Sequence, residues 1–250
     1  MSKISIITVT YNSAKTLEQT IQSVLLQDYE NVEYIIIDGQ STDDTLSIVR
    51  KYRHKIEHFV SEKDSGIYDA INKGIALATG DIIGILHADD FYTNDTVLTK
   101  IAEAFKKTNA AAVYADLYYV DKDNTHKIIR TWKSGNYKHG NFLWGWMPPH
   151  PTFFVKKDCY TKYGAYNTTM STAADYELML RFIHKHKIKI AYLPEFIVKM
   201  RVGGQSNVSI KNRIVANKDD RKAWELNGIK PYFFTLTLKP LRKMFQFIFK

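Results

Sequence analysis

The sequence predicts an α/β fold, in which an open sheet is flanked by helices. Two observations carry the prediction: short apolar runs alternate with amphipathic helical patterns through the first half, and polar or acidic residues follow the first four runs. Strands that alternate with helices in this way favour parallel βαβ units. Ligands of such sheets bind outside the carboxyl ends of the strands. The sequence therefore predicts a binding site at one edge of the sheet.

The first half supplies the alternating elements. Residues 4–9 are apolar and β-branched, as is typical of a strand covered on both faces. Ser13 is expected to cap a helix whose apolar residues recur at helical spacing. Further strands are expected at 32–37, 56–60, 82–86 and 111–114, and further helices from 41, over 67–78 and over 96–107.

The second half is less regular. Residues 118–120 and 128–131 flank a polar turn and predict a hairpin. Residues 132–149 are rich in aromatics and glycine without periodicity, which indicates a functional loop. A strand at 152–155, a helix at 174–185 and strands at 188–192 and 196–200 are expected to follow.

Composition bounds the protein class. The chain has 250 residues, 45% of them hydrophobic, which is enough for a core, and no linker-like stretch divides it. Cys159 is the sole cysteine, which fits a reducing compartment, and the apolar run near the N-terminus is too short to span a membrane. We therefore expect a cytoplasmic protein. The net charge of +9 suggests an anionic partner, whether phosphate, nucleic acid or membrane, although a merely soluble basic surface explains it equally.

Acidic and polar residues gather where the predicted strands end. Adjacent acids at the end of an apolar strand, Asp89 and Asp90, suit a divalent cation that neutralises a diphosphate; a helix cap or a solvated turn is the alternative. The residues that follow the four strands are Tyr11 and Asn12, then Asp38, then Glu62 and Asp64, then Asp89 and Asp90.

Three further side chains are candidates for chemistry. Asp38 can accept a hydrogen bond from a nucleobase N–H, or it can cap the next helix. Asp175 can act as a general base, or it can be an acid at a helix N-terminus that only stabilises the helix through its dipole. His150, held between prolines, can face a substrate or a metal, or it can be satisfied by backbone groups.

Two aromatic side chains of the loop 132–149 are further candidates for ligand binding. Trp144 and Trp146 can stack on sugar rings or pack in the core or a lid.

The sequence has no GxxxxGK[ST], GxGxxG or CxxC motif and no zinc-like spacing of His and Cys, which argues against P-loop ATPases, standard dinucleotide dehydrogenases and zinc enzymes.

Six short motifs, in this order and spacing, resemble those of family-two glycosyltransferases over roughly residues 3–205. The family resemblance implies the GT-A fold, a Rossmann-like open mixed sheet flanked by helices, here with a C-terminal helical extension. The motifs are TVTYN at 8–12, IDGQSTD at 37–43, DSGIYDAINKG at 64–74, GD at 80–81, HADD at 87–90 and ADY at 174–176.

The resemblance also implies roles for individual residues. Asp90, with Asp89, would hold Mn²⁺ or Mg²⁺, and Asp175 would be the catalytic base of a single inverting displacement. Asp38 would bind uracil, and the segment 64–69 would close over the base and ribose. The residues expected to bind a UDP-sugar donor are Val9, Tyr11, Asn12, Asp38, Ser41, Asp64, Gly66, Asp69 and Asp89. Those expected to bind the acceptor are Trp144, Trp146 and His150.

Two details qualify the resemblance. Many relatives carry a further acid where His87 stands, so Asp90 would bear more of the metal ligation here. Glu177 lies two residues beyond Asp175, so on a helix it should point elsewhere, which favours Asp175 as the base.

The expected organisation is a catalytic domain over 1–205, with a nucleotide-binding half (1–116) and an acceptor-binding half (117–205), followed by a helical extension over 206–250. The last residues, 239–250, combine basic and aromatic side chains without any acid, which suits an interfacial helix on anionic lipid. The alternative is a helix that packs on the protein or on a second subunit, as in a homodimer. We expect a peripheral enzyme on the inner face of the cytoplasmic membrane, acting on a glycan or a polyprenyl-diphosphate-linked acceptor of surface polysaccharide synthesis.

Three rival classes remain. A nucleotidyltransferase would carry a glycine-rich and basic loop after the first strand, which residues 11–14 are not. A nucleic-acid-binding domain is disfavoured because the basic residues are scattered and the strand ends are acidic, so no nucleic acid partner is expected. A non-catalytic nucleotide-sugar-binding module would not need Asp38, Asp90 and Asp175 together.

Overall fold

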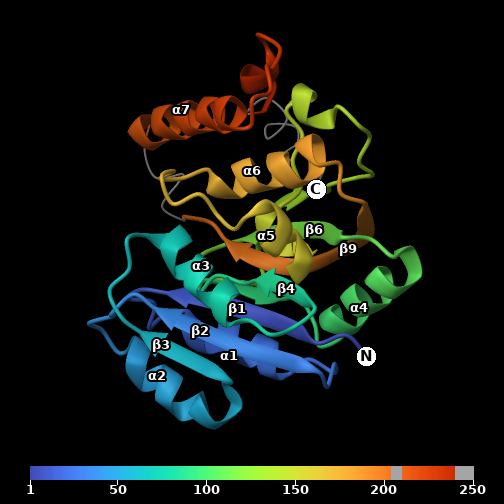
Figure 1. The fold of residues 1–250 in the computed structure, drawn as a ribbon. Coiled ribbons are helices and arrows are strands. Elements are labelled where there is room, and N and C mark those ends of the chain that lie inside the picture. Colours follow the sequence, from blue (N-terminus) through green and yellow to red (C-terminus); the bar gives the residue numbers. More distant parts are fainter. Residues whose placement is uncertain (204–209, 240–250) are drawn as a thin grey trace.

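The computed structural model describes residues 1–203 and 210–239, and within residues 210–217 it describes the backbone alone. In this part of the chain nine strands form one mixed sheet in the order β3-β2-β1-β4-β8-β6-β9-β5, with β7 paired to β6. Figure 1 shows the sheet running through the middle of the molecule, with α6 and α7 above β6 and β9 and with α2 at the opposite end beside β3.

One side of the sheet is parallel and the other is mixed. The parallel strands are β1 (Ile4–Thr10), β2 (Val32–Asp38), β3 (His58–Ser61) and β4 (Ile82–Ile85). β8 (Phe154–Lys156) runs antiparallel to both β4 and β6 (Ala112–Val120) and so joins the two sides. The remaining strands are β5 (Asp90–Tyr92), β7 (Ile128–Trp132) and β9 (Ile190–Arg201), of which β9 is parallel to β6.

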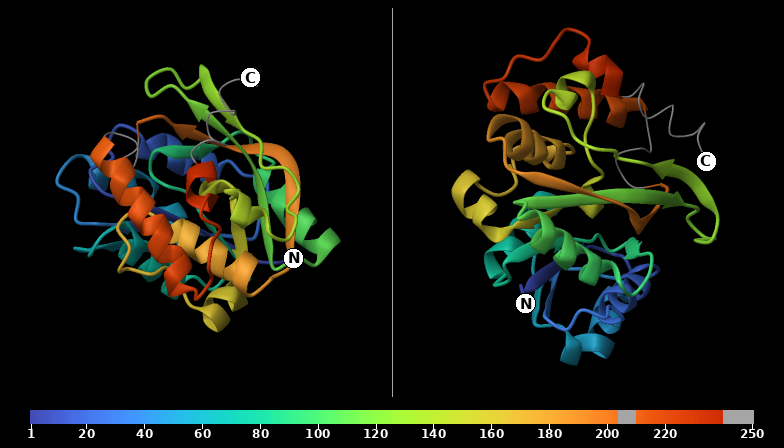
Figure 2. Two further views of the ribbon diagram at one scale, coloured as in Figure 1. Left: turned by 90° about the horizontal axis from the view of Figure 1, so that it is seen from above. Right: turned by 90° about the vertical axis from the view of Figure 1, so that its right-hand side faces the viewer.

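Helices cover the sheet in two groups. α3 packs on β1 and β2, and α4 packs on β6 and β9. In the right-hand view of Figure 2, α6 lies on the sheet and α7 lies outside α6. The helices are α1 (Leu17–Leu25), α2 (Thr45–Tyr52), α3 (Ile67–Leu77), α4 (Val97–Thr108), α5 (Lys157–Tyr163), α6 (Ala174–Met179, continued by a π-helical turn over Leu180–Lys185) and α7 (Ile210–Leu226).

Burial explains why the first strand was recognisable. Every residue of β1 is buried, since the strand lies between two neighbouring strands and has covered faces. The buried positions of α1 are Leu17, Thr20, Ile21 and Val24, which form one helical face. The predicted fold class, an open mixed sheet flanked by helices, is therefore confirmed.

Several element boundaries differ from the prediction. α1 begins at Leu17, and Ser13 does not cap it, because the Ser13 hydroxyl donates to the Tyr11 carbonyl. The strands predicted at 111–114 and 118–120 form one strand, β6, and those at 188–192 and 196–200 form one strand, β9. β5 and α5 were not anticipated, since three and seven residues are too short to show a period.

The predicted division into halves at 116/117 falls inside β6, so the two halves share one sheet. α7 and residues 227–239 supply the described part of the predicted extension, whereas 206–209 and 240–250 lie outside the described residues.

Candidate active site

The loops after β1 and β2 are joined by hydrogen bonds. Thr10 pairs with Asp38 in register, so the two strands end together. Asn12 adopts a left-handed φ of 48° and its backbone N–H donates to Ser41 Oγ at 2.8 Å, while its side-chain oxygen accepts the Thr42 N–H at 2.8 Å. Tyr11 is exposed beside this junction. The predicted donor residues Asn12 and Ser41 are thus in direct contact.

Asp38 is fully buried, and serines surround its carboxylate. It accepts hydrogen bonds from the Ser41 N–H at 3.0 Å, from the Ser41 hydroxyl and from Ser61 Oγ at 2.6 Å. Because α2 begins at Thr45 behind Asp44, the alternative of a helix cap is wrong. In this structure Asp38 fixes the turn that carries Ser41.

The segment 64–69 folds back toward the same loops. Asp64 accepts the Gly66 N–H at 2.9 Å, and Asp69 accepts the Ser65 N–H at 3.0 Å. Gly66 has a φ of 118°, a conformation that a side chain would strain. A Cβ built on Gly39 would come within 2.6 Å of Asp64 and 3.5 Å of the Tyr11 ring. Three loops that are distant in sequence therefore meet at a position without a side chain.

Asp90 is the most unusual carboxylate of the described chain. It is fully buried at the start of β5, and within the described residues neither of its oxygens has a hydrogen-bond partner. Burial, and then Asp89, raise the pKa of Asp90 well above its ordinary value. Asp90 is therefore neither a helix cap nor a solvated turn residue, and a cation or a proton is needed to offset its charge.

Arg201, at the end of β9, lies opposite the two acids. Its guanidinium donates to the Asp89 carbonyl oxygen and to the Gln19 side chain, and its charge opposes the rise in the pKa of Asp90. Sequence reasoning missed Arg201. A signal existed, because two adjacent acids call for a compensating charge and Arg201 directly follows a predicted strand.

The residues at this turn fit a divalent cation held jointly with a ligand. The described residues contain no cluster of three or more His, Cys, Asp or Glu side chains with metal-ligand geometry. Mg²⁺-type sites commonly use one or two carboxylates and take their other ligands from phosphates and water. The unpartnered oxygens of Asp90 and the half-buried Asp89 match that donor set.

The structure brings the predicted base and a predicted acceptor residue together. His150 Nδ1 lies 3.4 Å from Asp175 Oδ2, with both side chains mostly buried. The His150 ring also lies against the His87 ring, with ring centroids 5.3 Å apart. Burial, and then His150, lower the pKa of His87 to about 4, so His87 is neutral near pH 7.

Two tyrosines also border Asp175. Tyr68 from α3 stacks on Tyr166, with ring centroids 5.8 Å apart and an interplanar angle of 11°. Burial and the charge of Asp175 raise the pKa of the Tyr68 hydroxyl, while the backbone groups of Ala174 and Asp175 lower it. Sequence reasoning did not single out either tyrosine, since tyrosine on a helix or in a loop carries no signal of its own.

The Glu177 carboxylate is occupied by hydrogen bonds to other side chains. Its carboxylate contacts Arg181 through two hydrogen bonds of 3.0 Å and accepts a third from Asn227 at 2.9 Å. Tyr176, between Glu177 and Asp175, has its hydroxyl bonded to Trp224 Nε1 at 3.0 Å, and Lys239 Nζ lies 3.6 Å from its ring centre. The C-terminal segment thus holds the helix turn that carries Asp175.

The two predicted acceptor tryptophans have different environments. Trp146 is 5% exposed, packs on Tyr114 and Phe142, and donates its N–H to the Ser134 carbonyl at 2.8 Å, so it is a core residue in this structure. Trp144 is 54% exposed and contacts Phe234. Stacking on a sugar is therefore open to Trp144 and closed to Trp146.

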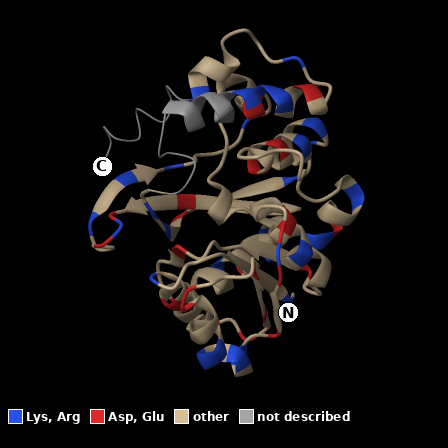
Figure 3. Ribbon diagram, turned by 90° about the vertical axis from the view of Figure 1, so that its left-hand side faces the viewer, with Lys and Arg blue, Asp and Glu red and all other residues tan. Residues whose placement is uncertain are grey.

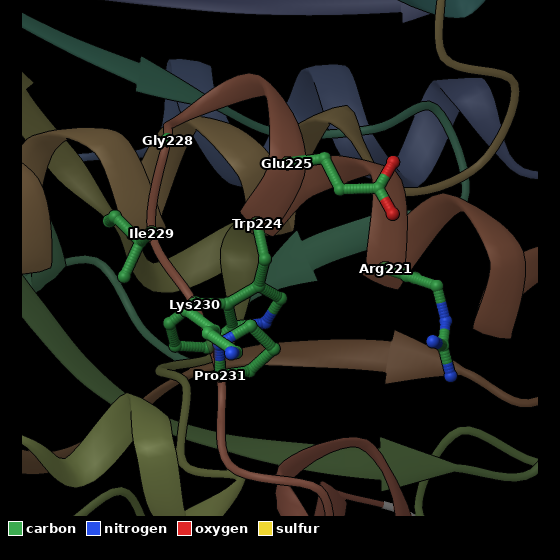
Figure 4. A pocket seen from close by; sticks show the side chains of 7 residues that line it. All are labelled: Arg221, Trp224, Glu225, Gly228, Ile229, Lys230 and Pro231. Carbon is green, nitrogen blue, oxygen red and sulfur yellow. The ribbon is translucent and has the colours of Figure 1, made fainter.

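A cavity of about 370 Å³ lies away from the strand ends. It is lined by α7 and the segment after it, as Figure 4 shows, and none of the predicted site residues lines it. We place the chemistry at the strand ends instead, because the buried carboxylates of Asp38 and Asp90 and the half-buried His87 and His150 are there. The lining residues are Arg221, Trp224, Glu225, Gly228, Ile229, Lys230 and Pro231.

The Lys and Arg residues of the described chain are spread over several elements. Figure 3 shows Lys and Arg on α7 and again at the end of α2, at opposite ends of the molecule. This distribution is unlike the continuous basic stripe of a nucleic-acid-binding domain.

Comparison with known proteins defines the class. Residues 5–157 match the Glycosyl transferase family 2 domain. An uncharacterized glycosyltransferase of Mycobacterium tuberculosis is 31% identical over 180 residues, which cover 71% of this chain and 68% of that protein. The chain belongs to glycosyl transferase family 2 and is a glycosyltransferase, as the motifs predicted.

Other relatives extend the match over more of the chain. Chondroitin synthase of Escherichia coli is 28% identical over 242 residues, which cover 93% of this chain but 34% of that protein. A glycosyltransferase of PGL/p-HBAD biosynthesis from Mycobacterium bovis is 27% identical over 222 residues, covering 82% of this chain and 80% of that protein.

Solved structures share the fold. TarS of S. aureus matches with a TM-score of 0.68 at 19% identity, over 90% of this chain and 64% of that chain. The mannosyltransferase PcManGT of Pyrobaculum calidifontis, solved with GDP-Man and Mn²⁺, matches with a TM-score of 0.68 at 19% identity, over 95% of this chain and 68% of that chain. None of the helices in the described ranges has the length and apolar character that crossing a bilayer requires.

Proposed function

We propose that this glycosyltransferase moves a sugar from a UDP-sugar to an acceptor hydroxyl with inversion at the anomeric carbon. The observation that carries the proposal is the Asp90 carboxylate, buried without a partner among the described residues at the edge where such sheets bind ligands. A nucleotide diphosphate with a divalent cation would offset that charge.

The loops around Gly39 are the proposed donor site. Asn12 is hydrogen-bonded to Ser41, and the Asp64 carboxylate approaches Gly39 so closely that a Cβ there would collide with it. Thr10 Oγ1, buried at the end of β1 without a partner in the described structure, adds a polar atom that sequence reasoning did not select. TarS has been solved with UDP-GlcNAc, which supports a UDP-sugar as the donor for this chain.

The proposed cofactor is Mn²⁺ or Mg²⁺, held by Asp90 and Asp89. When bound, it would neutralise the negative charge that grows on the leaving diphosphate. PcManGT was solved with Mn²⁺, which supports a divalent cation in this fold. Arg201 would offset part of the charge of the two acids before the cation binds.

The proposed reaction is a single displacement. The acceptor oxygen forms a bond to the anomeric carbon while the bond from that carbon to the diphosphate oxygen breaks, and the electron pair leaves with the diphosphate. The proton of the attacking hydroxyl passes to Asp175, which acts as the general base. Glu177 does not compete for this role because Arg181 and Asn227 occupy its carboxylate.

The proposed acceptor is a glycan or a polyprenyl-diphosphate-linked glycan of surface polysaccharide synthesis. The relatives named for chondroitin and PGL/p-HBAD synthesis support a polysaccharide or glycolipid acceptor. Trp144, half exposed beside Phe234, is the proposed aromatic contact for a sugar ring or for the lipid surface.

A panel of donors tests the reaction directly. Release of UDP is measured from UDP-, GDP- and dTDP-sugars with Mn²⁺ and with EDTA, and UDP binding is measured by calorimetry. We expect slow release from a UDP-sugar, abolished by EDTA. A protein that neither binds UDP nor releases a nucleotide from any donor would contradict the proposed donor class.

We propose that the enzyme docks on the inner face of the cytoplasmic membrane through the tail, 239–250, together with an aromatic patch. Residues 240–250 lie outside the described residues, and this part of the sequence combines basic and apolar side chains without any acid. The aromatic patch consists of Trp144, Tyr232, Phe233 and Phe234, and Phe233 is 96% exposed. A hydrogen bond of 2.7 Å from Thr235 Oγ1 to the Leu143 carbonyl joins the segment that carries the last three residues to the segment that carries Trp144.

Replacing Trp144 and Phe233 together by alanine is expected to reduce flotation with anionic vesicles several-fold, because exposed aromatics anchor proteins at the lipid interface. Leu26→Ala, which truncates another exposed apolar side chain, serves as the control and should float like the wild type. Unchanged flotation of the double variant, together with a lower mass on size-exclusion chromatography, would indicate that the patch is a homodimer face instead.

A further inference from the structure

We propose that His150 is a positioning residue for Asp175: its imidazole holds one carboxylate oxygen, so that the other faces the acceptor hydroxyl and receives its proton. This inference rests on the proposed function and adds a role to the same site. It replaces the predicted direct contact of His150 with the acceptor.

The first support is the contact itself. His150 Nδ1 lies 3.4 Å from Asp175 Oδ2, and 27% and 20% of the two side chains are exposed. Hydrogen bonds between catalytic groups are often long without substrate and shorten in the reacting complex. A neutral imidazole with its proton on Nδ1 can donate to this oxygen while its Nε2 accepts from another group.

The second support is the rigidity of the backbone that carries His150. Proline rings on both sides, Pro149 and Pro151, fix φ at their own positions. The short 3₁₀ turn His150–Thr152 is anchored by Thr152 Oγ1, which lies within 3.0 Å of the Pro149 and Ala115 carbonyls. The turn is thus bound to β6, so the backbone that carries the His150 imidazole is held in place.

The third support is the packing of the imidazole. His87, from the turn after β4, lies against the His150 ring at a centroid distance of 5.3 Å and a tilt of 58°. The Asp175 carboxylate, in the first turn of α6, contacts Nδ1 of the same ring. An imidazole that contacts both a neighbouring ring and a carboxylate has little freedom to turn toward a substrate.

The role follows from what a general base requires. A carboxylate turns about its terminal bond unless a partner fixes it, and a base oriented by another group is the common arrangement in proton transfer. With Oδ2 held by His150, Oδ1 becomes the proton acceptor. Misplacement of a reacting group by about 1 Å can lower the rate by about 10²-fold.

Matched substitutions separate this role from acceptor binding. Asparagine can present an N–H near the position of Nδ1, whereas alanine cannot. We expect His150→Ala to lower kcat by about 10-fold to 100-fold with the KM values for donor and acceptor unchanged, and we expect His150→Asn to recover most of the loss. His139→Ala, in the same loop and stacked on His184, is the control and should leave kcat unchanged.

Opposite results overturn the inference. A raised acceptor KM with unchanged kcat in His150→Ala would make His150 an acceptor ligand, and a His150→Asn protein as slow as His150→Ala would exclude action through Nδ1. Histidine NMR supplies a readout apart from turnover: Asp175→Asn should move the His150 resonances and leave those of His139 in place, and unmoved His150 resonances would refute the contact. Wild-type transfer is assayed in parallel, so failure of the proposed function shows there and failure of the His150 role shows in the variants alone.

Discussion

Asp90→Asn is expected to abolish sugar transfer and, at the same time, to raise the melting temperature of the metal-free protein near neutral pH. The carboxylate is buried without a partner among the described residues, so its charge costs free energy in the folded state. Asparagine keeps the shape and removes the charge. Differential scanning calorimetry in EDTA and a UDP-release assay measure the two effects.

The pH dependence of this stabilisation has a defined sign. The pKa of Asp90 is raised in the folded protein, so the folded state binds this proton more tightly than the unfolded state. The stability of the wild type should therefore fall as pH rises above the ordinary carboxyl value of 3.8 toward the folded pKa. The melting-temperature advantage of Asp90→Asn should grow over that range and disappear at lower pH.

Metal binding provides the control for Asp90. Mn²⁺ with UDP should stabilise the wild type, by about 2.7 kcal/mol when the ligand is at 100 times its Kd, and should stabilise Asp90→Asn far less. Asp95→Asn, which alters an exposed acid shortly after β5, should behave as the wild type in both assays. Equal Mn²⁺ stabilisation of Asp90→Asn and the wild type would remove Asp90 from the metal site.

Asp175→Asn is expected to lower kcat by roughly 10²-fold to 10⁴-fold, the usual contribution of a general base, while the Kd for UDP stays within about twofold of the wild type. Asparagine preserves the shape of the side chain but cannot accept the proton of the acceptor hydroxyl. Single-turnover assays and calorimetry give the two numbers separately.

The matched control for this variant is Asp158→Asn. Asp158 also lies in the first turn of a helix, α5, but it is exposed. If the Asp175 carboxylate only served the helix dipole, the two variants would lose comparable stability and both would keep their activity. Activity retained by Asp175→Asn would assign the base to another residue.

The edge of the sheet that carries the donor site could be predicted from the sequence, because parallel strands end together. To place Asp38 and Asp90 at this edge, it was enough to recognise residues 32–37 and 82–86 as strands of one parallel set, in which both lie beside β1. The turn geometry could not be foreseen. That Asp38 binds Ser41 and Ser61 instead of capping α2 depends on where α2 begins, and weak capping preferences do not fix that point.

The contacts of the second half were not predictable because they depend on how β8 is inserted. β8 joins β4 to β6 in antiparallel pairings, and this insertion brings the turn before β8, which carries His150, into contact with His87 and Asp175. Arg201 reaches Asp89 for a related reason, since β9 runs the full length of β6 and ends at the acids.

The different environments of Trp144 and Trp146 could not be predicted from the sequence pattern, because they depend on the local backbone conformation. Trp144 and Trp146 are separated only by Gly145, which ends the 3₁₀ turn Asn141–Trp144 in a left-handed conformation with a φ of 74°. One ring is therefore at the surface and the other is in the core. No periodicity marks such a turn, so the sequence could suggest aromatic contacts but could not assign them to one residue.

Truncation of the C-terminal segment should affect the active site. Trp224 is hydrogen-bonded to the Tyr176 hydroxyl, and Lys239 lies over the ring of Tyr176. Tyr176 is the neighbour of the proposed base, and the backbone of Lys239 also lies where a Cβ on Gly145 would collide with it. A chain cut before this lysine would keep the entire family-matched region, 5–157, and would still be expected to bind nucleotide. Its failure to transfer sugar would then be mistaken for a missing acceptor, so acceptor screens need protein that extends at least to Lys239.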